Sequence, residues 1–136
     1  MDDSRFFEAA QALAQGLSQW DLLIIAGSMV IIVSTSYYRP RTRKMRLAYF
    51  LFLPSWVLLA LSIYRGIEVQ GSYVAYLVAA RHNNQKLIES IASRINADTI
   101  SQIQFLKMAL LCLGFWLVIY IFWWVLSEKL HEESAR

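Results

Sequence analysis

The stretch YYRPRTRKMRLAYFLF, residues 37–52, concentrates five cationic side chains between two long segments that carry no charge. Lysine and arginine that cluster in a short connection mark the cytoplasmic side of a membrane protein. We therefore predict a cytoplasmic turn between two membrane-spanning helices, and we expect its cations to attract anionic lipid headgroups as well. The five residues are Arg39, Arg41, Arg43, Lys44 and Arg46.

The composition supports a membrane protein. Of 136 residues, 57% are hydrophobic and 17% are charged, whereas soluble domains are about 25% charged. The formal net charge is +3, but the basic residues are flanked by apolar segments and not spread along a polar face, which disfavours nucleic acid as a partner. One cysteine, Cys112, rules out an internal disulfide and a cysteine-based zinc site.

Three segments without charged residues, 22–38, 47–64 and 108–127, have the length that a bilayer requires. The sequence therefore predicts an all-α membrane protein with three transmembrane helices at about 21–38, 47–65 and 105–128. The basic turn then places the N-terminus outside and the C-terminus in the cytoplasm. The small size and the acidic start, which is unlike a signal peptide, suggest a bacterial inner membrane and a first span that is retained.

The segment 1–20 has an apolar face at helical spacing, with Ser4 as a predicted N-cap and a predicted helix end near Gly16. We expect this short amphipathic helix to lie along the outer membrane interface. Packing against the outer loop is the alternative. The apolar face consists of Phe6, Phe7, Ala10, Leu13, Ala14 and Leu17.

The connection 66–104 is predicted to form an outer helical hairpin. Residues 66–80 could form two short strands, but we favour a second helix that continues to about Arg81 and turns at residues 82–84. An amphipathic helix follows, and Asn96, Asp98 and Thr99 are expected to interrupt it. Thr99 with Gln102 matches a capping box, which predicts that the third membrane helix begins near residue 99 and continues into the cytoplasmic tail of segment 105–136.

Small residues recur every seven positions on the first two spans and predict one packing face on each. Lining of a pore is the alternative interpretation. The predicted faces consist of Gly27 and Ser34 on the first span, and of Ala48, Ser55 and Ser62 on the second.

Pro54 is predicted to kink the second span, because it removes a backbone hydrogen bond. Trp56 and Trp116 would then lie near the membrane midplane, where each indole N–H needs an acceptor from another helix or another subunit. The carbonyl group that Pro54 frees is one candidate acceptor.

The sequence gives little support for transport of ions, metal binding or catalysis within the predicted spans. The segments 22–38, 47–64 and 108–127 contain no Asp, Glu, Lys, Arg or His, and Asp21, Arg65 and Lys107 are expected to be solvated residues at the outer edges of the spans. His82 and His131 lack a second ligand at helical spacing, so no metal or haem site is expected. No nucleophile–base arrangement or phosphate-binding loop is present, so we expect neither catalytic residues nor a cofactor.

The sequence thus favours a small, non-catalytic integral membrane subunit that acts through helix–helix association, either with copies of itself or with another membrane protein. A homo-oligomeric channel, pore or transport protein is the alternative. A lysis or toxin-type membrane protein is a weaker one.

Overall fold

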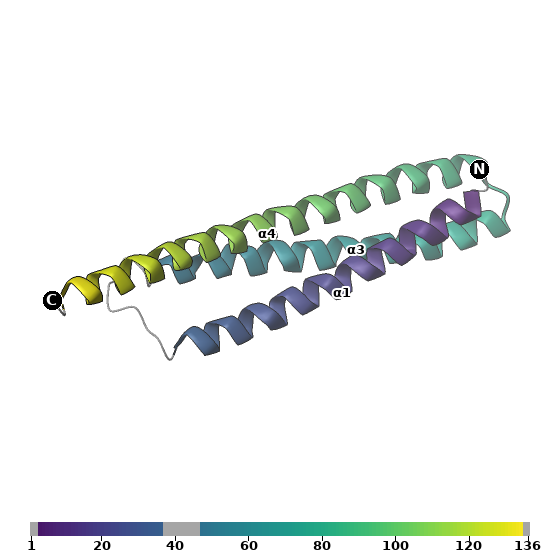
Figure 1. Cartoon of the computed structure of the whole chain (residues 1–136). Helices are drawn as coiled ribbons and strands as arrows, with labels where there is room; N and C mark the ends of the chain where they lie inside the picture. Colours follow the sequence, from purple (N-terminus) through teal and green to yellow (C-terminus); the bar gives the residue numbers. More distant parts are fainter. Residues whose placement is uncertain (1–2, 37–46, 135–136) are drawn as a thin grey trace.

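The computed structural model describes the backbone of residues 3–36 and 47–134 and the side chains of residues 4–35 and 47–127. Its elements are α1 (Asp3–Ser36), the 3₁₀ turn η1 (Tyr49–Leu51), α3 (Phe52–Arg81) and α4 (Gln85–Ser134). The three long helices lie side by side in an elongated bundle (Figure 1). The N-terminus and the α3–α4 turn lie at one end, and the C-terminus lies at the other. The prediction of an all-helical protein is confirmed.

Each helix is long and apolar enough to cross a membrane, over Ser4–Thr35, Tyr49–Arg81 and Gln85–Ser127. These ranges exceed the roughly 20 residues that a hydrocarbon layer needs. Three candidate membrane helices therefore agree with the expected class of integral membrane protein. α1 and α4 are longer than predicted, and α3 ends at Arg81, as the favoured interpretation expects.

The core follows a heptad pattern, because the buried positions recur mostly at steps of three and four residues on α3 and α4 and at steps of seven on α1. Such a pattern keeps one side of each helix facing its partners along the whole bundle. α3 packs most extensively on α4, then on α1, while α1 and α4 meet least. The buried positions include Phe7, Ala14, Asp21 and Ser28 on α1, Ser55, Leu59, Ser62, Gly66 and Val69 on α3, and Ile91, Ile95, Asp98, Gln102, Ala109 and Trp116 on α4.

The N-terminal segment is the first half of α1 and not a separate interfacial helix. The helix passes through Gly16 without a break, so the predicted end at this glycine is wrong. Phe7 is 1% exposed, and its ring stacks on that of Tyr76 with 3.7 Å between the ring centroids. Packing against the segment 66–104, the alternative, is what the structure shows. Phe7 belongs to a core cluster with Ala14, Val69, Ala79, Ile91 and Ile95.

The turn between α3 and α4 confirms the helical interpretation of residues 66–80. The N–H of Asn84 donates to the carbonyl of Ala79, and that of Asn83 donates to Ala80. These two bonds form a Schellman motif. Asn83 has a φ of 51°, a conformation that asparagine tolerates better than most residues. The side chain of Asn84 accepts from the N–H of Leu87 and caps α4.

α4 runs from Gln85 to Ser134 without interruption, so the predicted break at residues 96–99 is wrong. Thr99 does not form a capping box, because its hydroxyl donates to the carbonyl of Ile95 in the preceding turn. The side chain of Gln102 instead reaches α1. The segment 66–104 therefore forms a hairpin, but both of its arms are continuous with the apolar helices.

Pro54 lies in the first turn of α3, directly after η1. The N–H groups of a first helical turn have no acceptor within the helix, so proline is tolerated there. The irregularity predicted within the second span is therefore located at the beginning of α3.

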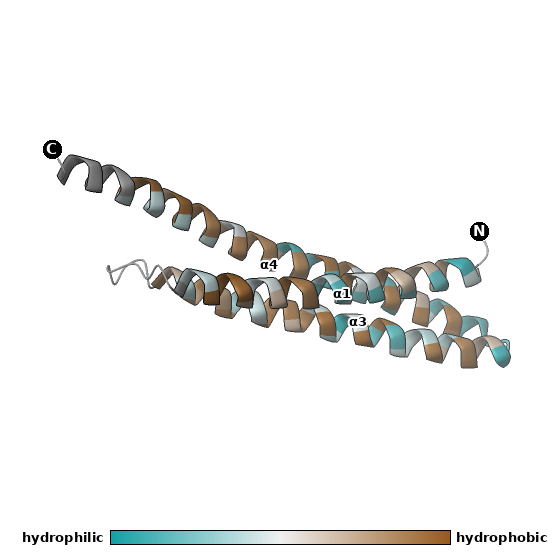
Figure 2. Ribbon diagram, turned by 60° about the horizontal axis from the view of Figure 1, so that its bottom comes forward, coloured by the Kyte–Doolittle hydropathy of each residue, from teal (hydrophilic) through white to brown (hydrophobic). Residues whose placement is uncertain are grey.

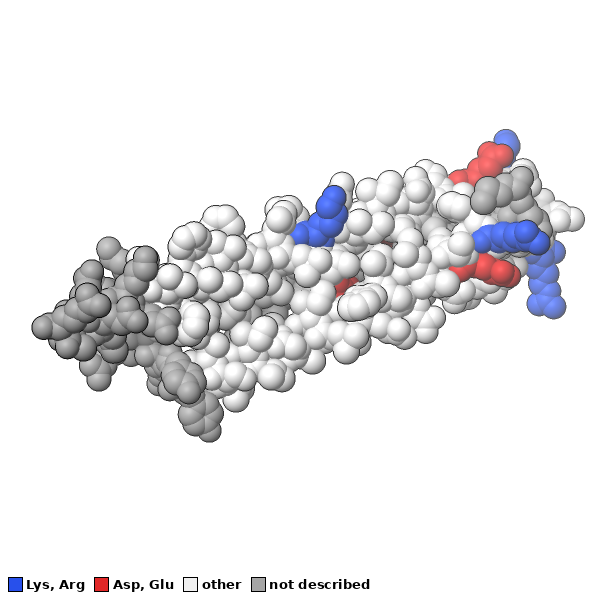
Figure 3. All heavy atoms as spheres, viewed as in Figure 1, with Lys and Arg blue, Asp and Glu red and all other residues white. Residues whose placement is uncertain are grey.

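The two halves of the bundle differ in polarity. Residues 22–35, 47–64 and 108–127 carry no charge, and many of their large apolar side chains are exposed. Hydrophilic residues become frequent toward the end that holds the N-terminus (Figure 2). The space-filling view shows acidic and basic side chains gathered at that end, while basic atoms and a small acidic patch are visible midway along the body (Figure 3).

Candidate functional site

A buried polar layer joins all three helices where the two halves of the bundle meet. Asp21 of α1 is 0% exposed, as are Ser62 of α3 and Gln102 of α4. The Ser62 hydroxyl lies 2.6 Å from Asp21 Oδ2 and 3.2 Å from the carbonyl oxygen of Gln102. One serine thus contacts both neighbouring helices. Each residue occupies a core position of the heptad pattern.

A second set of contacts adjoins this layer, one helical turn away along α1. Gln102 Nε2 donates to the carbonyl of Ala14 at 3.2 Å and to Ser18 Oγ at 3.3 Å. Ser18 in turn donates to the same Ala14 carbonyl. Gly66 of α3 faces this group, and a Cβ there would lie 2.5 Å from Ser18 Oγ, so a larger residue would have to displace these side chains. The amide of Gln102 therefore ties α4 to α1 across the glycine of α3.

Three buried oxygen atoms of this region have no hydrogen-bond partner among the described residues, namely Asp21 Oδ1, Gln102 Oε1 and Asp98 Oδ2. A buried polar atom without a partner carries a desolvation penalty, so such atoms are uncommon in folded proteins. Two of the three belong to the layer of Asp21, Ser62 and Gln102.

An ion-pair cluster lies one turn farther toward the charged end. Arg65 donates to Asp98 Oδ1 at 3.1 Å and lies 3.8 Å from Glu68 Oε2. Arg94 lies 3.8 Å from the same glutamate oxygen. The cluster links α3 to α4 and partly compensates the buried Asp98 carboxylate.

The three predicted boundary residues have different environments. Lys107 is exposed, as predicted, and Arg65 is partly buried in its ion pairs. Asp21 is fully buried, so the prediction of a solvated side chain is wrong for this residue. Its position explains the difference, since α1 does not begin at residue 21 but passes through it as a core position.

The residues of the predicted packing faces have different environments on the two spans. Ser55 and Ser62 are fully buried, and Ser55 Oγ donates to the carbonyl of Ala109 on α4 at 3.2 Å. Ala48 is half-buried. Gly27 and Ser34 are exposed, and Ser34 bonds back to its own helix at Val30. The buried face of α1 lies one residue away, at Asp21 and Ser28.

Trp56 has an acceptor on another helix, but not the one that Pro54 would free. Its indole N–H donates to Ser28 Oγ at 2.8 Å, and Ser28 donates to the carbonyl of Ile25 at 2.7 Å. Trp116 is 3% exposed and lies among aromatic rings, stacked on Tyr120 and edge-on to Phe52. Both tryptophans therefore serve contacts between helices.

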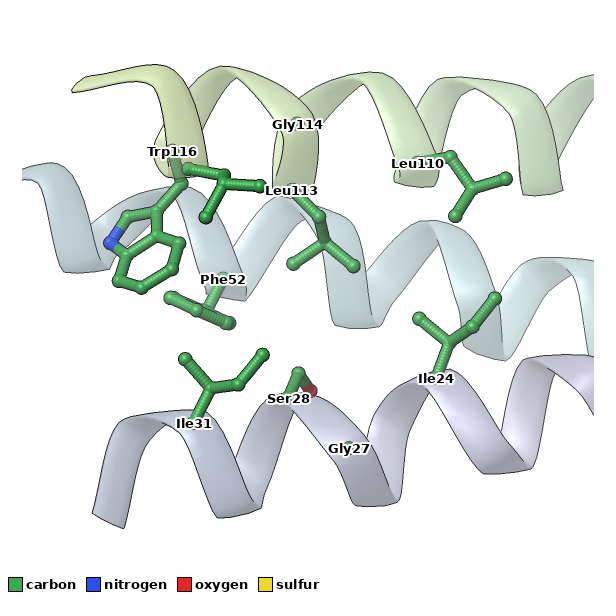
Figure 4. Close-up of a pocket in the computed structure, with 10 residues that line it drawn as sticks. Ile24, Gly27, Ser28, Ile31, Phe52, Leu110, Leu113, Gly114 and Trp116 are labelled. Carbon is green, nitrogen blue, oxygen red and sulfur yellow. The ribbon is translucent and has the colours of Figure 1, made fainter. Parts of the chain in front are cut away.

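An apolar groove of ≈ 400 Å³ opens between α1 and α4 in the uncharged half. Side chains of the two helices point into it from opposite sides, and Phe52 of α3 forms its floor (Figure 4). Gly27 and Gly114 leave it wide, because nothing lies within 4 Å of where their Cβ atoms would be. In both ribbon views, α1 and α4 diverge toward the end of the bundle that is opposite the α3–α4 turn (Figures 1 and 2).

Among the described residues, no group of three His, Cys, Asp or Glu side chains could hold a metal ion. His82 is exposed in the α3–α4 turn. The five cations of residues 39–46 and the side chain of His131 lie outside the described part of the chain.

No protein-family model matches the chain, and neither does any curated protein or solved structure.

Proposed function

We propose that this protein is a small, non-catalytic integral membrane subunit that acts by associating with other membrane helices. The bilayer surrounds the uncharged half, in which residues 47–64, which end in α3, and residues 108–127 of α4 are 18 and 20 residues long. At 1.5 Å per residue they cover about 27–30 Å, which matches the hydrocarbon layer. The charged half then projects from the membrane as a three-helix stalk, formed by residues 3–20, 66–81 and 85–106.

The observation that carries the proposal is an apolar stripe on the stalk. Ile67, Val74 and Val78 of α3 are 60%, 60% and 56% exposed, with Leu77 beside them at 51%. α1 and α4 cover the opposite face of α3, and they leave the face with this stripe exposed. Exposed apolar stripes beyond the hydrocarbon layer are typical of surfaces that bind another protein. A helix with its own apolar stripe would pair with this one as in a coiled coil.

The groove between α1 and α4 gives a second contact surface within the bilayer. Its two glycines allow a close approach, which favours helix association in lipid, where packing replaces the hydrophobic effect. Side chains of a neighbouring helix would fit it as knobs. The stripe and the groove lie on different sides of the bundle, an arrangement that suits a subunit held between neighbours.

A pore has less support. Ser55 and Ser62 were its predicted lining residues, and their hydroxyl groups are used within the chain, toward Ala109 and Asp21. A channel formed by several copies would need other polar groups along its path.

The association is tested by purifying the tagged protein in mild detergent and measuring its native mass. We expect a stoichiometric complex with a partner or with further copies. Val74→Glu and Val78→Glu should release the partner without loss of helicity, because both positions are exposed in the free chain. Ser90→Glu, at an exposed position of α4 on the same stalk, should retain it. Recovery of a monomer from the unmodified protein would contradict the proposal.

For the orientation, we propose an external N-terminus and stalk, with the basic turn and the C-terminus in the cytoplasm of a bacterial cell. The five cations of the turn then lie at the inner leaflet, where anionic lipids attract them. Cysteine placed at position 90 in a Cys112→Ala background should react with an impermeant thiol reagent in intact cells. Cysteine at position 42 should react only after permeabilisation, and the opposite pattern would invert the topology.

A further inference from the structure

We propose that Asp21 is a proton-binding site, and that the proton it holds fastens α1 to the other two helices. This role lies beyond the association of the subunit with its neighbours. It concerns the layer of Asp21, Ser62 and Gln102.

The first argument is the number of hydrogen atoms available. Ser62 Oγ lies within hydrogen-bond distance of two acceptors, Asp21 Oδ2 and the Gln102 carbonyl oxygen, but a hydroxyl group has one hydrogen to donate. An ionised Asp21 adds none, so the Ser62 hydroxyl would then donate to the carboxylate, and the Gln102 carbonyl oxygen, 3.2 Å away, would receive no hydrogen from it. A protonated Asp21 resolves both contacts. Its Oδ2–H donates to Ser62 Oγ, and the Ser62 hydroxyl donates to the Gln102 carbonyl.

The two distances differ. The Asp21–Ser62 separation of 2.6 Å is that of a strong hydrogen bond, a length that a carboxylic acid donor and a carboxylate acceptor share. The Ser62–Gln102 separation of 3.2 Å is that of a weaker bond, to a carbonyl that also takes part in the backbone bonding of α4.

The second argument is the missing counter-charge. Asp21 is fully buried, and its Oδ1 has no partner among the described residues. A buried carboxylate with neither a cation nor a full set of donors is very costly, and such a group takes up a proton instead. In the protonated acid, Oδ1 is a neutral carbonyl oxygen, for which burial without a partner costs far less.

The neighbouring charged groups have other partners or lie elsewhere. On α3, Arg65 pairs with Asp98 and Glu68. On α4, Asp98 takes part in that pair, and Lys107 is exposed. α1 has no other charged residue between Glu8 and Thr35. No described cation is therefore paired with Asp21.

Protonation then governs how α1 is held. Loss of the proton would leave a charge buried between three helices, and the least costly response is for α1 to separate from Ser62 and Gln102 so that water reaches the carboxylate. The folded bundle binds a proton here that the unfolded chain has released at neutral pH, so stability falls as the pH rises.

Infrared spectroscopy tests the proton directly, because the C=O stretch of a carboxylic acid differs from the bands of a carboxylate. At about pH 7 we expect a carboxylic acid band in the purified protein, shifted by ¹³C labelling of aspartate and lost in Asp21→Asn. Asp98→Asn is the matched control and should remove carboxylate absorption, since Asp98 is paired with Arg65. Absence of an aspartic acid band in the labelled, unmodified protein would overturn the proposal, whether or not the variants fold.

Thermal unfolding in detergent tests whether the stability of the bundle falls as the pH rises. Between about pH 5 and pH 9, the melting temperature of the unmodified protein should fall, whereas Asp21→Asn, whose amide can donate to Ser62 at every pH, should lose most of that dependence. Equal pH dependence in both proteins would contradict the proton's role in holding α1.

Discussion

Gly66 of α3 lies so close to Gln102 of α4 that a Cβ on the glycine would stand 2.7 Å from the glutamine Nε2. The same amide donates to the carbonyl of Ala14. The absence of one side chain on α3 thus permits a hydrogen bond between the two helices on either side of it.

Gly66→Ala should therefore destabilise the bundle. The added methyl group would displace the Gln102 amide from its acceptors on α1, at a cost of about 1–3 kcal/mol from overpacking and lost hydrogen bonds. Gly71→Ala on the same helix is the matched control, because nothing lies within 4 Å of its Cβ position. Alanine there should stabilise α3 by up to about 1 kcal/mol through helix propensity. Melting temperatures in mild detergent distinguish the two, and equal effects would contradict the close contact at Gly66.

The two buried serines of α3, Ser55 and Ser62, should contribute differently to the stability of the bundle. Ser62→Ala removes the hydrogen-bond partner of Asp21 and leaves a buried carboxyl group without any, which costs about 1–3 kcal/mol. Ser55→Ala removes a hydrogen bond to the Ala109 carbonyl, but this carbonyl keeps its backbone hydrogen bond within α4. The free energy of unfolding should therefore fall by about 0.5–1.5 kcal/mol. Unfolding by denaturant measures both. A larger loss for Ser55→Ala would show that the Asp21 layer contributes less than its geometry implies.

The sequence allows the helical class, the three apolar segments and the turn at residues 82–84 to be predicted, because each depends on local chemistry. Apolar segments of membrane length must satisfy their backbone groups internally. Asn83 and Asn84 are suited to the positive φ and the cap that the turn requires. These features need no knowledge of which helix faces which.

The polar layer could not be predicted in the same way. A charged residue beside an apolar segment favours the end of a span, so the sequence predicts a solvated edge for Asp21. The buried series on α1 is Phe7, Ala14, Asp21 and Ser28, and its members share a spacing of seven but no chemical character. The seven-residue spacing of small residues points instead to Gly27, one position away from the buried Ser28.

The continuity of α4 was missed for a related reason. Asn96, Asp98 and Thr99 favour helix ends because their side chains compete for backbone groups. In the bundle, Asp98 is paired with Arg65 of α3, and Thr99 bonds to Ile95 in its own helix. Tertiary contacts therefore satisfy groups that would otherwise end the helix.

The hydrogen bond from Trp56 to Ser28 is predicted to couple α3 to α1 in the uncharged half of the bundle. Trp56→Phe and Ser28→Ala each remove it, and their double-mutant cycle should give a coupling energy of about 0.6 kcal/mol, with about 1.7 as the upper range for such bonds in membranes. Trp56→Phe with Ser34→Ala is the control pair, since Ser34 bonds to its own helix, and it should give additive effects. Additivity in the first cycle would mean that the indole N–H has another acceptor.

The docking of the N-terminal half of α1 depends on Phe7, which stacks on Tyr76 inside the stalk. Phe7→Ala should cost about 3–5 kcal/mol, the range for removing a buried aromatic side chain. The adjacent Phe6 is 39% exposed, and Phe6→Ala should cost well under half as much. Hydrogen exchange along residues 3–20, measured in detergent, should increase in Phe7→Ala and remain close to that of the unmodified protein in Phe6→Ala. An interfacial helix, resting on the bilayer and not on α3, would respond alike to both changes, because either ring could face the lipid.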